Sequence, residues 1–233
     1  MGLTLVKSQC ENESVIKKYW PVALLIVGLL IFGGVYFFVI RGGDELPVEE
    51  EEVVAEIPLD MRPVVSLTPT SDGHYLNLLI EGIKLAAYTL DYELLYQTGE
   101  GATQGVPGSI KLDGKDSFES ELLLGSESSG KFRYDTGVNE GTLTLRFRDE
   151  KGKLLGKLST DFHLVTGTDE LASLDGNFNF MLDGDEDEYY VVMETFGPYE
   201  MAYGVFGSVK PEGEPGEGWD EVSDGIFVQV ASE

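Results

Sequence analysis

An unbroken apolar run near the start of the chain is the clearest feature of its hydropathy pattern. No charged residue occurs from residue 20 to residue 40, which read WPVALLIVGLLIFGGVYFFVI. At about 1.5 Å of rise per residue, a helix of this length reaches about 30 Å, the thickness of a bilayer's hydrocarbon core. The run is apolar on every face, so a helix buried in a soluble core explains it less well. The pattern therefore predicts a transmembrane helix over residues 20–40.

The composition of this run supports the membrane interpretation. Pro21 falls in the first helical turn, where its missing N–H costs nothing, and Trp20 falls at an interface, where amphipathic rings settle. A cleavable signal peptide has a shorter apolar core and a small-x-small site after it, so we interpret the run as an uncleaved signal anchor. The residues that define the predicted anchor are Trp20, Pro21, Gly28, Gly33, Gly34 and Ile40.

Positive charges flank the predicted helix unevenly. Lys17 and Lys18 precede it, whereas Arg41 alone follows it closely. The positive-inside rule then places residues 1–19 in the cytoplasm and the rest of the chain outside the cell, with one pass through the cell membrane. The sole cysteine, Cys10, and the sole glycosylation sequon both precede the helix. An exported part without either feature is typical of a bacterial or archaeal envelope.

Acidic residues dominate the stretch after the predicted helix. Residues 41–61 contain four consecutive glutamates with a proline on either side. Such a segment repels itself and stays extended, which predicts a flexible acidic linker. From residue 62 to residue 233 the pattern changes to period two, which predicts one extracytoplasmic domain.

Alternation of apolar and polar side chains in residues 62–233 predicts antiparallel strands with one buried face. It is clearest in three segments, residues 88–97, 142–148 and 157–164, the last two joined by a polar turn that ends at Gly152. Turn residues, among them Pro107-Gly108 and residues 125–130, separate the predicted strands. The other predicted strands are 75–80, 117–124, 131–134, 177–182, 189–194, 205–209 and 226–230.

Many short strands and almost no helical periodicity beyond residue 40 predict an all-β fold, an antiparallel β-sandwich. Residues 141–165, GTLTLRFRDEKGKLLGKLSTDFHLV, resemble the closing hairpin of immunoglobulin-like and fibronectin III-like domains of exported surface proteins. The resemblance implies an immunoglobulin-like architecture, without the paired cysteines of antibody domains, and implies no activity. Residues 167–233 exceed one such domain; they extend the sandwich or form a second small β-unit.

The charge of the chain is strongly negative and unevenly distributed. It has 16 Lys and Arg against 42 Asp and Glu, a net charge of −26. Residues 1–43 hold four basic and two acidic residues, so the excess negative charge follows the predicted helix. Nucleic-acid binding needs clustered Lys and Arg, and is therefore excluded. The electrostatic field of this negative charge favours basic or Ca²⁺-bridged partners.

Two sets of residues are candidates for binding. Asp183, Asp185 and Asp187 lie in an acidic run, and closely spaced carboxylates are how proteins hold Ca²⁺; a solvated turn is the alternative interpretation. Tyr199, Tyr203 and Trp219 are candidates for an aromatic surface that binds sugar or peptide; the alternative is that they cover the edge of a core. No cofactor other than Ca²⁺ is predicted.

Catalytic motifs are missing from the sequence. It has no G-x-S-x-G nucleophile elbow and no phosphate-binding glycine loop, and its two histidines, His74 and His163, fit exposed positions. We therefore expect no enzyme, but a membrane-anchored binding, adhesion or envelope-assembly module whose partner is an envelope protein or polymer. Two alternatives stay open: a hydrolase that uses paired carboxylates in a cleft, and a structural domain stabilised by Ca²⁺.

Overall fold

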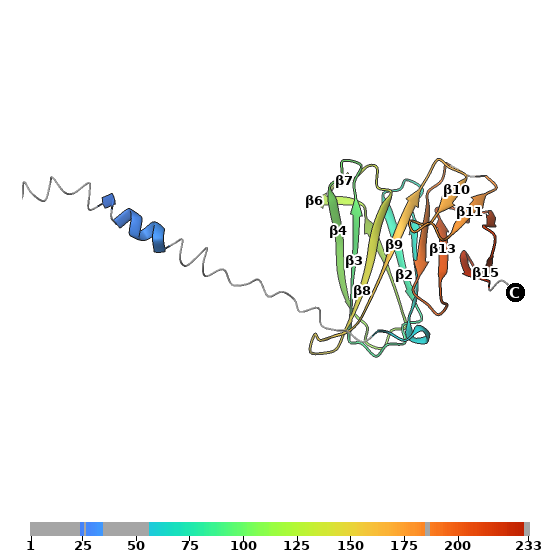
Figure 1. Cartoon of the computed structure of the whole chain (residues 1–233), viewed down its shortest axis with the longest axis horizontal. Helices are drawn as coiled ribbons and strands as arrows, with labels where there is room; N and C mark the ends of the chain where they lie inside the picture. Colours follow the sequence, from blue (N-terminus) through green and yellow to red (C-terminus); the bar gives the residue numbers. More distant parts are fainter. Residues whose placement is uncertain (1–23, 26, 35–55, 185–186, 231–233) are drawn as a thin grey trace, which may run out of the picture. The chain divides into compact units, whose positions relative to one another are not determined.

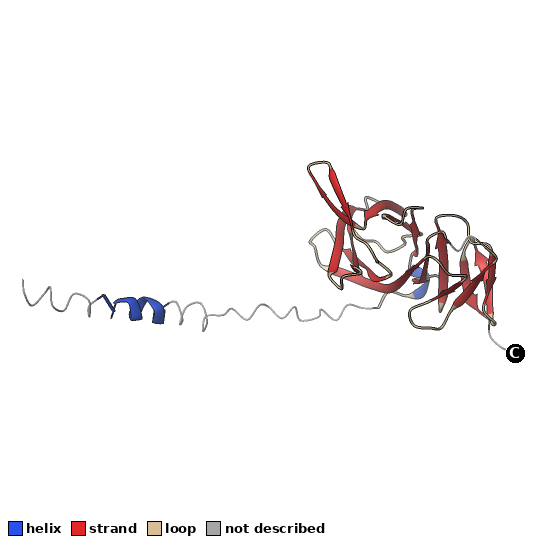
Figure 2. Cartoon of the chain, turned by 90° about the horizontal axis from the view of Figure 1, so that it is seen from above, coloured by secondary structure: helices blue, strands red, loops and turns tan. Residues whose placement is uncertain are grey.

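The structure, a computed structural model, describes residues 24–25, 27–34, 56–184 and 187–230 (Figure 1). The chain divides into two compact units, Met1–Glu52 and Val53–Glu233. In the first unit the described residues are helical (Figure 2) and include Gly28, Gly33 and Gly34 of the predicted anchor.

Most of the predicted transmembrane segment falls outside the described residues. Its undescribed members, with the flanking charges, are Trp20, Pro21, Ile40, Lys17, Lys18 and Arg41. Within the described parts of the chain, no helix combines the length and the apolar character needed to cross a membrane.

Strands make up most of the second unit. Its described residues form sixteen strands and one short 3₁₀ helix. They are η2 (Leu59–Met61), β1 (Val64–Pro69), β2 (Tyr75–Glu81), β3 (Thr89–Gln97), β4 (Thr103–Lys111), β5 (Ser117–Leu123), β6 (Gly125–Ser128), β7 (Lys131–Tyr134), β8 (Glu140–Arg148), β9 (Leu154–Val165), β10 (Glu170–Ala172), β11 (Asn179–Leu182), β12 (Tyr190–Thr195), β13 (Ala202–Gly207), β14 (Gly213–Pro215), β15 (Trp219–Ser223) and β16 (Ile226–Gln229).

The strands assemble into four sheets. The largest has the order β15-β16-β13-β12-β9-β8-β3-β4, and the others are β1-β2-β5, β10-β11-β14 and the hairpin β6-β7. Every pairing between described strands is antiparallel. The prediction of a mostly β architecture with antiparallel sheets is therefore confirmed.

The eight-stranded sheet has a separate core on each of its faces. Strand β12 contributes to both, because successive side chains of a strand point to opposite faces. Val191 and Met193 enter the first core, whereas Tyr190 and Val192 enter the second. The second core lies between this sheet and β10-β11-β14, so in the described part of the chain no sheet faces the half of the second face that runs through β8 and β3 to the edge strand β4.

The first core lies between β1-β2-β5 and the strands β3, β8, β9 and β12. Its members include Leu94 of β3, Leu145 of β8 and Phe162 of β9, all buried. The alternation predicted for residues 88–97, 142–148 and 157–164 is thus confirmed. The turn between β8 and β9 also forms as expected: Asp149 Oδ1 accepts the backbone N–H groups of Lys151 and Lys153, at 2.8 and 2.9 Å.

The second core is an aromatic cluster. The ring of Phe178 stacks on Tyr203, with centroids 5.3 Å apart, and meets Trp219 edge-on at 5.1 Å. Phe227 packs against both Phe178 and Phe180, with centroids 5.5 and 5.4 Å apart. Residues after 167 therefore supply four strands to the large sheet and also enclose a core of their own.

Two predicted turns are wrong. Pro107-Gly108 lies inside β4, at the edge of the large sheet, where a strand has a partner on one side only and proline is tolerated. The ring of Tyr92 covers Gly108 so closely that a Cβ there would lie 2.1 Å from its Cζ. Residues 125–130 contain β6, and the turn itself is confined to Ser129 and Gly130, whose φ values are 53° and 74°.

The second unit takes in residues that precede the predicted start of the domain. Ile57, within the expected linker, is 3% exposed and belongs to the first core. Its side chain occupies the space beside Gly156, where a Cβ would lie 2.5 Å from the Ile57 Cδ1 atom. The folded chain therefore begins before residue 62.

Candidate binding groove

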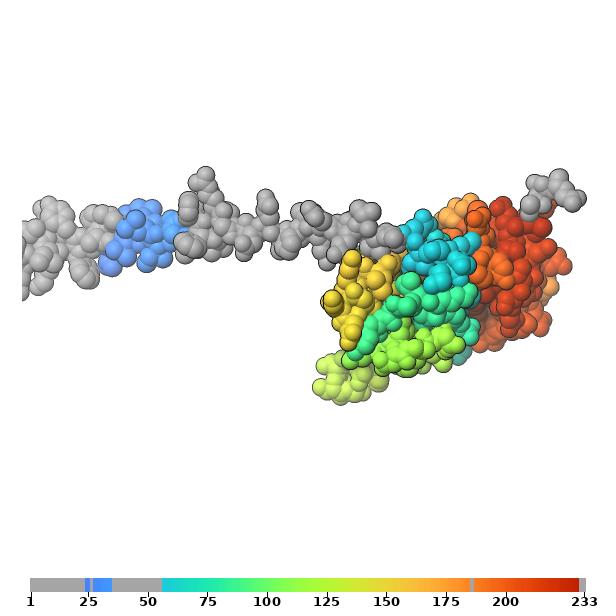
Figure 3. Space-filling model, turned by 90° about the horizontal axis from the view of Figure 1, so that it is seen from below, coloured from blue at the N-terminus to red at the C-terminus, as the bar shows by residue number. Residues whose placement is uncertain are grey.

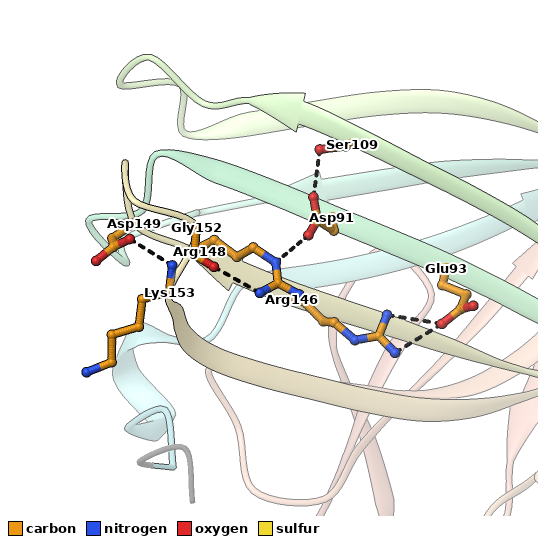
Figure 4. A network of polar contacts seen from close by, with 8 residues as sticks. All are labelled: Asp91, Glu93, Ser109, Arg146, Arg148, Asp149, Gly152 and Lys153. Atoms are coloured by element: carbon orange, nitrogen blue, oxygen red, sulfur yellow. Dashed lines mark hydrogen bonds and ion pairs between the residues drawn. The ribbon is translucent and has the colours of Figure 1, made fainter. Parts of the chain in front are cut away.

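The uncovered half of the second face carries paired charges (Figure 4). Both Nη atoms of Arg146 on β8 donate to Glu93 Oε2 on β3, at 3.0 Å. Arg148 Nε donates to Asp91 Oδ2 at 2.7 Å, and the Ser109 hydroxyl donates to the other oxygen of Asp91 at 2.6 Å. Burial alone would raise the pKa of Asp91, but the bonds from Ser109 and Arg148 outweigh it and hold this pKa below its ordinary value.

Two adjoining hollows lie where this open face meets the loop between β10 and β11. The larger, about 440 Å³, has Leu95 of β3, Thr142 of β8 and Glu140 in its wall. The smaller, about 230 Å³, extends the hollow toward β12 and β13. Asp161 of β9 and Leu174 of the loop line both, so the two hollows adjoin, and together we call them the polar groove.

Leucine side chains are unusual features of this groove. Leu95 is 39% exposed and Leu174 is 44% exposed, and both line the same hollow. Between them Thr142 donates its hydroxyl to Asp161 Oδ1 at 2.7 Å. The groove therefore offers apolar contacts beside carboxylate and hydroxyl groups, a mixture typical of binding sites.

Asp175 organises the end of the groove near β13. It accepts hydrogen bonds from the Ser173 hydroxyl at 2.6 Å, from the backbone N–H and side-chain amide of Asn177 at 3.1 and 3.0 Å, and from the Tyr203 hydroxyl. Burial would raise the pKa of Asp175, but these donors stabilise the charged form and lower it. Burial and the Asp175 hydrogen bond together raise the pKa of Tyr203.

Glu194 of β12 lines the same end of the groove. Burial, and then the negative charge of Asp175, raise the pKa of Glu194, and Arg62 opposes the effect. Among the described residues that line the two hollows there are four carboxylates and no Lys, Arg or His. The groove therefore suits a ligand that brings positive charge.

The predicted aromatic surface does not form. Tyr203 is 3% exposed and Trp219 is 8% exposed, because both rings face the second core rather than solvent. Tyr199 is exposed at 41%, in the connection between β12 and β13. The alternative interpretation, that such aromatics cover a core, is the correct one for Tyr203 and Trp219.

The predicted calcium ligands are only partly described. Asp185 lies outside the described residues, whereas Asp183 and Asp187 lie within them. The backbone N–H of Asp183 donates to the Glu212 carbonyl at 2.9 Å, and the Asp187 carbonyl accepts the Thr166 hydroxyl at 3.2 Å. In the described part of the chain no three His, Cys, Asp or Glu side chains are grouped to hold a metal ion. A calcium site here stays a prediction.

Both histidines have structural contacts. His163 Nδ1 lies 2.7 Å from the Ala172 carbonyl, which can only accept, so this nitrogen carries the proton and ties β10 to β9. The His74 ring stacks on Tyr134, with centroids 3.8 Å apart, and its Nδ1 lies 3.0 Å from Asp72 Oδ2. Neither ring lines the groove.

Sequence reasoning did not find the groove. Its carboxylates Asp161, Asp175 and Glu194 come from β9, the β10–β11 loop and β12, and they are brought together by the pairing of β9 with β12 and by the hydrogen bond from Tyr203 of β13 to Asp175. The one usable signal was that Leu95 breaks the alternation of β3. Comparison of the chain with protein-family models, with curated proteins and with solved structures found no match in any of the three. Its function is therefore inferred from the chain's own sequence and geometry.

Proposed function

We propose that residues 20–40 anchor this protein in the cell membrane, with the N-terminus in the cytoplasm, and that residues 53–233 act outside the cell as a binding module. The uncharged run and the lysines before it support the anchor and its direction. Two antiparallel sheets over the first core, with the β8–β9 hairpin in the larger one, support an immunoglobulin-like sandwich as the finer description of the fold.

The polar groove carries this proposal. It joins two exposed leucines to four carboxylates, and its described lining residues include no Lys, Arg or His. A partner segment with Lys or Arg beside apolar side chains matches both features, because opposite charge attracts and leucines gain from being covered. The partner class is therefore a basic segment of an envelope protein.

Catalysis by the groove is a weaker alternative. A carboxylate-dependent hydrolase needs two facing acids that are free to attack or to exchange protons. Asp175 is occupied by donors from Ser173, Asn177 and Tyr203, which fix its orientation. These hydrogen bonds support a structural role for Asp175. They favour a groove that binds a ligand without turnover.

A short synthetic peptide of alternating Lys and Leu tests the proposal, with a Glu-Leu peptide of equal length for comparison. We expect the full-length chain in mild detergent to bind the Lys-Leu peptide and not the Glu-Leu peptide, as measured by fluorescence anisotropy. Removing two groove charges in Asp161→Asn/Glu194→Gln should weaken binding about tenfold, the size of effect typical of close charge pairs.

The matched control removes two exposed carboxylates of β5, Glu119→Gln/Glu121→Gln, which lie away from the groove. This variant should bind the Lys-Leu peptide as the unaltered chain does. An equal loss of affinity in both double variants would mean that the peptide responds to overall charge, and would contradict a specific groove. A peptide or glycan product that accumulates with the unaltered chain and not with Glu194→Gln would also contradict the proposal, because it would show turnover.

A further inference from the structure

The β6–β7 hairpin stands apart from the sheets of the second unit. Among the described strands, β6 and β7 pair only with each other, and Figure 3 shows this lime-green segment projecting from the body of the molecule. All four side chains of β7 are exposed. A two-stranded hairpin is marginally stable in water when both faces are bare, so such a projection is a candidate for contact with a partner.

The two faces of β7 differ in chemistry. Phe132, 49% exposed, and Tyr134 point to one side, and their rings stack with centroids 6.2 Å apart. Lys131 and Arg133 point to the other side and form no ion pair with any described residue. The stack of Tyr134 on His74 holds the base of the hairpin against the body. We call residues 125–134 the knob.

A hollow of about 380 Å³ lies at β14, β15 and β16, at the other end of the second unit from β6 and β7 (Figure 1). Its lining includes Phe180, Trp219 and Phe227, residues of the second core that are 3%, 8% and 3% exposed. The volume lies within the range of pockets that enclose small ligands, enough for an aromatic side chain. We call this hollow the socket.

Carboxylates surround the socket. Glu214, Asp220 and Glu221 line it and have no ion-pair partner among the described residues. A fourth carboxylate, Asp224, pairs with Lys210 at 2.9 Å. The socket therefore combines a hollow beside the second core with an excess of negative charge, and that charge is the complement of the knob's two cations, which have no ion-pair partner among the described residues.

We propose that the knob of one copy of this chain binds the socket of a second copy. Phe132 would enter the hollow while Lys131 and Arg133 approach the carboxylates that line it. Knob and socket lie at opposite ends of the second unit, so the contact is head-to-tail and leaves one knob and one socket free at the ends of each assembly. Such a heterologous contact, when it does not close into a ring, builds linear chains.

Charge reversal tests this inference on the full-length chain in mild detergent. Sedimentation velocity should show self-association that weakens at about 1 M salt, where the Debye length falls to about 3 Å. The knob variant Lys131→Glu/Arg133→Glu and the socket variant Glu214→Lys/Asp220→Lys should each weaken association at least tenfold, because each brings like charges together. All four positions are exposed, so folding should be unchanged.

A mixture of the two variants makes the decisive comparison. It restores both kinds of contact, natural knob with natural socket and reversed knob with reversed socket, so an equimolar mixture should associate as the unaltered chain does. That recovery also shows that both variants are folded. The control Lys151→Glu/Lys153→Glu reverses two exposed charges of the β8–β9 turn and should associate normally.

Three results would overturn the inference: an unaltered chain that stays monomeric at every concentration, reversal variants that associate normally, or variants that fail to recover on mixing. None of these bears on peptide binding by the groove, because the knob and the socket share no lining residue with it. Failure of one proposal therefore leaves the other standing.

Discussion

Replacing Phe178 by alanine is expected to lower the free energy of unfolding by about 3–5 kcal/mol, the usual cost of deleting a buried aromatic side chain. Phe178 is 1% exposed and lies at the centre of the second core, where its ring meets Tyr203, Trp219 and Phe227. Removing it leaves a cavity that three large rings cannot readily close. It also takes away the aromatic contacts that add to the burial of apolar area.

Urea unfolding of the full-length chain, followed by far-UV circular dichroism, measures this effect. The matched control is Phe132→Ala in the knob, where the phenyl group is about half exposed and the loss should be small. The two variants remove the same atoms, so the difference between them reports burial alone. Equal losses would mean that Phe178 is not enclosed as the structure has it.

Leu94→Ala should cost about 2–5 kcal/mol of unfolding free energy, the range found for buried leucines. Leu94 is fully buried in the first core, and its neighbour Leu95 is exposed on the opposite face of β3. Leu95→Ala is therefore the control on the same strand. It should change stability little and should instead weaken the binding of the Lys-Leu peptide to the groove.

The same unfolding curves separate the two residues. A large loss of unfolding free energy for Leu94→Ala with a small loss for Leu95→Ala would show that Leu94 faces the first core and that Leu95 does not. If Leu95→Ala costs as much as Leu94→Ala, then both faces of β3 are covered and there is no open groove beside it. Since β12 lies in both cores, the Leu94 and Phe178 variants should also each unfold in a single transition.

Period-two alternation was enough to predict the central strands. Leu143, Leu145 and Phe147 of β8 are buried, because each lies on the same face of a strand that is packed on one side. Local turn chemistry was equally informative at Asp149, whose carboxylate closes the β8–β9 turn. Both signals depend on residues that are close in sequence.

Long-range pairing was not available from one sequence. Val191 and Val192 are adjacent and both buried, which alternation does not predict; they face different cores because a third sheet covers β12 on its second face. The same covering buries Tyr203 and Trp219. The polar groove arises at the border of that covering, so neither the groove nor the second core has a local sequence signature.

Pro107 shows how a local rule can mislead. Proline followed by glycine is typical of a turn, yet this pair continues a nine-residue edge strand. Proline cannot donate a hydrogen bond to a neighbouring strand, and an edge strand has a neighbour on one side only. The ring of Tyr92 fills the space over Gly108. Strand order, which sets which strand is at the edge, was the missing information.

We expect the N-terminal apolar run to anchor the chain and the folded unit to act outside the cell. Protease accessibility of a C-terminal epitope tag in intact cells tests it most directly, with a cytoplasmic protein as the control for lysis. Protease added outside the cells should remove the tag while the control survives, and the protein should sediment with membranes. A tag that resists digestion until the cells are lysed would contradict it.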